Sequence, residues 1–143
     1  MNERCMDCGF ELWIPISDLR CSTIGLYNDA RFPGRCLLMF NEHVEALEDL
    51  DGEALENWML DLRAASTVIK KVAGARRINL AILGNAEPHL HAHLIPRIPD
   101  DDPIPTQSPW DHPLSAMALD PHRVDELVRQ LKDELAPVSR EGV

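Results

Sequence analysis

The stretch His89-Leu90-His91-Ala92-His93-Leu94-Ile95 alternates histidine with apolar residues. Alternation with a period of two is typical of a β-strand, in which residues i, i+2 and i+4 point to the same face. The pattern therefore predicts a strand over residues 89–95 that carries three imidazoles in a row, spaced roughly 6.6 Å per step. The intervening apolar residues are expected to point into the core.

A row of imidazoles permits three kinds of chemistry. Neutral ring nitrogens bind metal ions, exchange protons near neutral pH or attack an electrophile such as phosphorus. The row could instead have no function, as polar residues on the surface or as the remnant of a purification tag. A tag lies at a terminus, however, and this row is internal. A zinc hydrolase with one ion held by all three histidines is disfavoured, because the outer pair is roughly 13 Å apart on a straight strand.

The segments on either side predict an α+β fold with a mainly antiparallel sheet and two helices. Asp51 is a suitable N-cap for the long helix, and Gly74 is a suitable residue to end it. The other expected elements follow from hydrophobic periodicity and proline content. In chain order they are a buried strand at 36–40, the long helix at Gly52–Ala73, a strand at 78–82, the histidine strand, a proline-rich loop at 96–113 and a C-terminal helix at about 120–136.

Length and charge limit the function. A chain of 143 residues is enough for one domain. The net charge of −10 excludes a general nucleic-acid binder, which needs a basic surface. There is no apolar leader and no run of about 18 apolar residues, so we expect a cytoplasmic protein without a membrane span. In that compartment the four cysteines are expected to be reduced thiols.

The histidine pattern resembles the signature of the histidine triad (HIT) family, His-φ-His-φ-His-φ-φ with φ apolar. Phe32-Pro33-Gly34 and Asn41-Glu42-His43-Val44 upstream, and Pro96-Arg97 downstream, are similar to that family too. The resemblance covers roughly residues 5–100 and implies a single HIT-like domain over residues 1–143. Leu83-Gly84-Asn85 and Pro88 look most like a bacterial branch that resembles diadenosine polyphosphate hydrolases.

This resemblance implies a nucleotide hydrolase or transferase that needs no cofactor for its chemistry. His91, the middle histidine, would attack the α-phosphate of a dinucleoside polyphosphate or a nucleoside phosphoramidate and become transiently nucleotidylated. His93 would steady the phosphate charge, and His89 would flank the row as the third catalytic histidine. Asn28 would lie near the ribose. The family also implies a homodimer.

Two departures from the family pattern concern phosphate binding. Arg35 stands where many members carry a fourth histidine, and the short loop before the triad lacks the usual Ser, Thr or Gln. Arg35 and Asn85 are therefore the candidate phosphate-binding residues in this chain. The same departures keep open a second function, a HIT protein that binds nucleotides without turnover.

The spacing Cys5-x2-Cys8 fits half of a tetrahedral zinc site, but a single CxxC is a weak signal. No thioredoxin-like pattern surrounds it, which disfavours a redox role. The family resemblance implies that His43 and His89 complete a structural zinc site. His89 would then hold the metal rather than take part in the chemistry.

Overall fold

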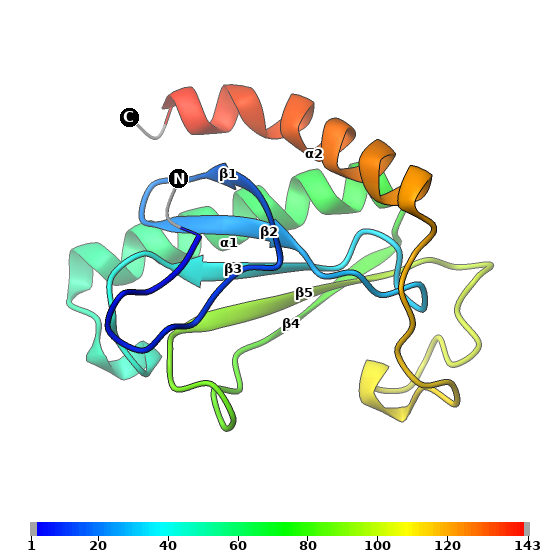
Figure 1. Ribbon diagram of the computed structural model, residues 1–143, viewed down its shortest axis with the longest axis horizontal. Coiled ribbons are helices and arrows are strands. Elements are labelled where there is room, and N and C mark those ends of the chain that lie inside the picture. The colour runs from blue at the N-terminus through cyan, green and yellow to red at the C-terminus, as the bar shows by residue number, and fades with distance from the viewer. Residues whose placement is uncertain (1–2, 142–143) are drawn as a thin grey trace.

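A five-stranded antiparallel sheet and two long helices make up the computed structural model, which describes residues 3–141 (Figure 1). The strands lie in the order β1-β2-β3-β5-β4, and each neighbouring pair is antiparallel. This arrangement confirms the predicted α+β fold. The elements are β1 (Ile14–Asp18), β2 (Ser22–Leu26), β3 (Cys36–Phe40), η1 (Leu47–Asp49), α1 (Gly52–Ala73), β4 (Arg77–Ala81), β5 (His91–Arg97), η2 (Pro109–Asp111) and α2 (Pro121–Glu141), where η marks a short 3-10 helix.

The two faces of the sheet have different neighbours. On one face, alternate residues of β3 and β5 join the main core with buried side chains of α1 and α2, among them Trp58 and Leu127. On the other face, Leu37 and Met39 of β3 pack against the N-terminal segment through Cys5, Phe10 and Leu12. Because side chains alternate along a strand, His91 and His93 share this second face, away from the helices.

The long helix forms at the predicted bounds. The Asp51 side chain accepts a hydrogen bond from the Ala54 amide at 2.8 Å, and Gly74 ends the helix in the left-handed region at φ 67°. The C-terminal helix extends to Glu141, beyond the predicted end near residue 136, although Pro137 lies inside it. A proline removes one intrahelical hydrogen bond without ending every helix. No helix within residues 3–141 is long and apolar enough to cross a membrane.

The histidine strand is shifted from its predicted bounds of 89–95. It begins at His91, because β3 pairs with it only from Met39↔His91 onward, and His89 lies in a bend before it. It continues through Pro96 to Arg97, so the proline-rich loop begins at residue 98 rather than 96. Pro96 is tolerated because β5 pairs only with β4 beyond Leu94, which leaves one strand edge without a partner.

Candidate functional site

His91 lies at the start of β5 with one ring nitrogen engaged and the other free. Its Nδ1 is 2.6 Å from the carbonyl oxygen of His89. Since a carbonyl only accepts, Nδ1 carries the hydrogen and donates it, and Nε2 keeps its lone pair. The Phe10 ring lies 4.7 Å from the imidazole, and only 6% of His91 is exposed. The imidazole is therefore fixed in the tautomer that a nucleophile at Nε2 requires.

A cavity of about 510 Å³ borders His91 and His93. On one side, the rings of Trp13 and Tyr27 lie 4.9 Å apart, and 68% of Trp13 is exposed. The remaining lining comes from the N-terminal segment, β3 and the loop before β5, including Asn85, and none of the lining residues is Lys or Arg. The cavity is thus bordered by an aromatic wall and by His91.

Arg35 lies behind His93 and does not line this cavity. Its guanidinium donates to Asp29 Oδ2 through Nη1 and to His93 Nδ1 through Nη2, both at 3.0 Å. Its Cζ lies 3.9 Å from the centroid of the Tyr27 ring. Burial, and next the nearby charge of Arg35, lower the pKa of His93 to about 4. Arg35 was expected to bind phosphate, but it contacts His93 instead, and His93 lines the cavity.

The two predicted asparagines have different surroundings. Asn85 lines the cavity, in the loop that precedes the histidines. Asn28 Oδ1 accepts a hydrogen bond from the Leu119 amide at 2.7 Å, which ties the turn after β2 to the segment before α2. Their contacts with a nucleotide stay predictions, as does a direct contact between Arg35 and phosphate.

Sequence reasoning missed four residues that shape the site. Phe10, Trp13 and Tyr27 lie far from the triad in sequence and carry no motif. Asp29 follows the predicted Asn28 directly, and its place in a turn gave no sign that it would be fully buried. The available signal was the two arginines that follow Asp29 closely, Arg31 and Arg35, because a buried carboxylate needs such partners.

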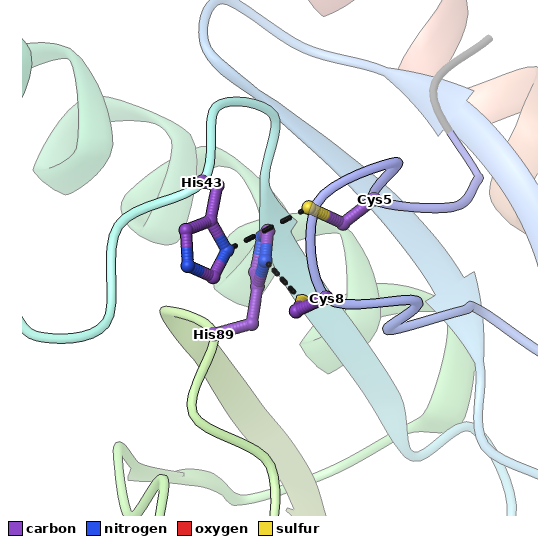
Figure 2. Close-up of side chains that lie close together, drawn as sticks. All are labelled: Cys5, Cys8, His43 and His89. Atoms are coloured by element: carbon purple, nitrogen blue, oxygen red, sulfur yellow. Dashed lines mark hydrogen bonds between the residues drawn. The ribbon is translucent and has the colours of Figure 1, made fainter.

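The predicted metal ligands come together from three separate segments (Figure 2). Cys5 and Cys8 lie in the N-terminal loop, His43 follows β3 and His89 precedes β5. Their ligand atoms all lie within 4.8 Å of one another. Cys5 Sγ is 3.7 Å from His43 Nδ1, and Cys8 Sγ is 3.4 Å from His89 Nδ1. The side chains point toward a common centre.

This Cys/His group fits a tetrahedral zinc ion. Bonds of about 2.0–2.3 Å place neighbouring ligand atoms roughly 3.3–3.8 Å apart, close to the two measured separations. His89 Nε2 donates to the Phe40 carbonyl at 2.7 Å, so its Nδ1 lone pair faces the thiols. Burial opposes ionisation of Cys5, but hydrogen bonds from the backbone amides of Cys8 and Asp7 lower the pKa of its thiol overall. The cluster could hold zinc, and neither His91 nor His93 belongs to it.

Comparison with known proteins decides the family. The sequence model of the HIT domain family matches residues 16–100, more than half of the chain. The chain belongs to the histidine triad family. A search of curated proteins gave no match. The expected family is therefore confirmed, whereas the diadenosine polyphosphate hydrolase branch stays a prediction.

Solved HIT proteins share this fold. A histidine triad protein from Bradyrhizobium japonicum is 28% identical, with a TM-score of 0.76 over 85% of this chain and 89% of that one. The zinc-bound histidine triad family protein of Mycobacterium smegmatis is 20% identical, with a TM-score of 0.59 over 89% and 86%. The diadenosine triphosphate hydrolase of Plasmodium falciparum is 18% identical, with a TM-score of 0.63 over 86% and 76%. The last two show the fold alone.

Proposed function

We propose that this HIT protein is a nucleotide hydrolase or transferase that forms a covalent nucleotidyl-His91 intermediate. The observation that carries the proposal is the hydrogen bond from His91 Nδ1 to the His89 carbonyl. It leaves Nε2 as a lone-pair nitrogen, which a nucleophile needs, on a side chain that lines the cavity. Family membership supports a nucleotide-binding or hydrolase function in general terms.

The reaction has two displacements at the α-phosphorus. The Nε2 lone pair of His91 forms a bond to phosphorus, while the bond from phosphorus to the leaving group breaks; its electron pair departs with that group, which takes up a proton from solvent. Water then attacks the same phosphorus and releases one proton to solvent, the P–N bond breaks, and the nucleoside monophosphate and neutral His91 are released. Dividing one hard displacement into two easier ones is the benefit of covalent catalysis.

The cavity supplies places for the rest of the substrate. The pair Trp13 and Tyr27 offers an exposed aromatic face on which a nucleobase can stack. His93 lies beside His91, with ring centroids 5.4 Å apart, and is positioned to contact the phosphate. We place Asn85 and the loop amides around it on the phosphate, and Asn28 near the ribose.

The substrate is a dinucleoside polyphosphate or a nucleoside phosphoramidate. The diadenosine triphosphate hydrolase of Plasmodium falciparum shares the fold and supports the first class. Glu11 and Glu87 line the cavity without any Lys or Arg. The negative charge of a long phosphate chain is therefore poorly compensated in this cavity. Nucleoside phosphoramidates should be tested as substrates for this reason.

A structural zinc ion completes the proposal. Cys5, Cys8, His43 and His89 would hold it, and the zinc-bound relative from Mycobacterium smegmatis supports this assignment. Zinc would tie the N-terminal loop to the segment before β5. A catalytic zinc on all three row histidines is not favoured, because their nitrogens engage different partners.

We also propose that the protein acts as a homodimer in the cytoplasm. Strand β4 lies at one edge of the sheet, and Leu80, Ile82 and Leu83 on or after it are exposed. An unpaired edge with apolar side chains is suited to pairing with a second copy. Light scattering on wild type and Leu80→Glu tests this interface, and a monomeric wild type would contradict it.

Intact-protein mass spectrometry after rapid mixing tests the mechanism. Diadenosine tetraphosphate and adenosine phosphoramidate would each be mixed with wild type, with His91→Ala and with His122→Ala, an exposed histidine as the matched control. We expect an adenylyl adduct and AMP release in wild type and His122→Ala, with or without a chelator. His91→Ala should lower AMP release by several orders of magnitude, because it removes the nucleophile.

Three results would contradict the mechanism. Activity that survives in His91→Ala would exclude the covalent step at this residue. Activity lost with the chelator while circular dichroism shows a retained fold would favour a metal hydrolase. Nucleotide binding with neither adduct nor AMP would favour the binding protein without turnover.

A further inference from the structure

Arg35 is held rigidly in a buried cage of three side chains. Its guanidinium bridges Asp29 and His93, and its flat face lies over Tyr27. The Arg35 side chain is 8% exposed, and that of Asp29 is fully buried. Asp29 is fixed in turn by Arg31, which donates to both carboxylate oxygens. If the buried Arg35 guanidinium turned away, it would lose its contact with the Asp29 carboxylate, which is costly.

The contact with Arg35 decides the tautomer of His93. A guanidinium has five N–H donors and no acceptor. Because Nη2 of Arg35 can only donate across the 3.0 Å contact, Nδ1 of His93 must accept with its lone pair. The hydrogen of neutral His93 is then on Nε2. This is the opposite of His91, whose hydrogen is on Nδ1 because it faces a carbonyl.

We propose that Arg35 is a positioning residue that holds His93 in its Nε2–H tautomer, so that His93 meets the substrate phosphate as a neutral hydrogen-bond donor. This inference rests on the proposed function and adds the residue that sets the two neighbouring histidines apart. One imidazole then presents a lone pair to phosphorus, and the next presents an N–H group to a phosphoryl oxygen. Preorganised donors of this kind stabilise the charge that develops during phosphoryl transfer.

The surroundings of His93 favour this neutral form. Arg35 lies on one side of it, His91 on another, and the rings of Tyr27 and Trp110 lie 6.2 and 5.9 Å from it. Among these neighbours the only permanent charge is positive, so a second proton on His93 is disfavoured. Its lowered pKa agrees with this arrangement. His93 is thus a fixed donor over the working pH range rather than an acid that transfers a proton.

Imidazole ¹⁵N NMR on the full-length protein tests the proposal without any turnover. Long-range ¹H–¹⁵N spectra distinguish a protonated from an unprotonated ring nitrogen, and His93→Asn identifies the signal. In wild type, we expect His93 with hydrogen on Nε2 and a bare Nδ1 between pH 5 and 8. Arg35→Met, which removes every donor, should let the ring populate the Nδ1–H form beside the Nε2–H form and titrate at a higher pH. Arg129→Met, at an exposed arginine on α2, is the matched control.

Single-turnover adenylylation provides the second measurement. Removing the partner that orients a metal-bound imidazole typically costs about 10- to 100-fold in activity, and Arg35 orients His93 by the same kind of hydrogen bond. We expect that loss in the rate of adduct formation for Arg35→Met, with a smaller change in substrate affinity, and the acid limb of the pH profile moved to higher pH.

A wild-type His93 with hydrogen on Nδ1 would overturn the proposal, and this result needs no variant to fold. So would a folded Arg35→Met variant in which both the tautomer and the titration of His93 match wild type. The expected tautomer in a wild-type protein that forms no adduct would support the role of Arg35 and contradict the proposed covalent chemistry instead, so the two failures are distinguishable.

Discussion

The two ends of the histidine row have the same residue type and opposite surroundings. At one end, His89 is fully buried, bonded to a backbone carbonyl and turned toward two thiols. At the other end, His93 accepts from a guanidinium that is held by a carboxylate. His91 between them is fixed by a carbonyl. In this row, the partner of each imidazole decides which nitrogen is free and therefore what each histidine can do.

The difference also separates stability from chemistry. The His89 end joins the N-terminal loop to the sheet, so its loss should act on folding. The His93 end borders the cavity, so its loss should act on the reaction as well. Three experiments measure what each end contributes to stability, in order of decreasing expected effect.

Cys8→Ser should have the largest effect and should act on metal and stability. We expect wild type to bind one zinc ion and Cys8→Ser to lose it, because a tetrahedral site needs all four ligands. When free zinc is present at 1,000 times its Kd, losing the bound ion lowers the free energy of unfolding by about 4 kcal/mol. Metal analysis and urea unfolding with and without a chelator measure both quantities.

The matched control for this experiment is Cys21→Ser, whose thiol lies outside the metal cluster and contacts Asp61. It should retain zinc. A wild-type protein that binds no zinc, or a Cys8→Ser variant as stable as wild type, would remove the structural half of the comparison.

Asp29→Asn should destabilise the other end by a smaller amount. Asp29 is fully buried between Arg31 and Arg35, and its replacement leaves two guanidinium groups without their counter-charge. Breaking a buried pair in this way typically costs about 3 kcal/mol or more. Urea unfolding measures the loss, and exposed Asp133→Asn is the control. A cost near that of the control would show that Arg35 is not held by this carboxylate.

Acidic pH should lower stability by the smallest amount. The pKa of His93 is lowered to about 4 in the folded protein, against about 6.5 in an unfolded chain. As pH falls from about 6.5 to about 4, the unfolded chain takes up this proton and the folded protein does not, so stability decreases. At pH 5 the expected cost from this group is about 1–2 kcal/mol.

Urea unfolding of wild type and His93→Asn at several pH values isolates this contribution. The variant should lose less stability than wild type between pH 6.5 and 4.5, whereas His122→Ala should follow wild type. Parallel pH curves for wild type and His93→Asn would show that the buried imidazole does not stay neutral.

The sequence by itself determined the local features of this protein. Alternation over residues 89–95 predicted a histidine strand, and β5 forms there with an offset of two residues. Helical periodicity with Asp51 and Gly74 predicted α1 at its observed bounds. Both succeed because a periodic pattern within one element records which face is buried. The metal cluster came from resemblance to the family, since spacing alone supplied only the two cysteines.

Only the tertiary structure decided how the histidines differ. Arg35 is 58 positions from His93, and Cys8 is 81 positions from His89, yet these pairs set the free nitrogen at each end. The offset of β5 is also decided by a tertiary contact, because its pairing with β3 begins only at His91. Local periodicity carries no information on such contacts. The physical reason is that an imidazole has two similar nitrogens, and the choice between them belongs to whichever distant group the fold brings within hydrogen-bond distance.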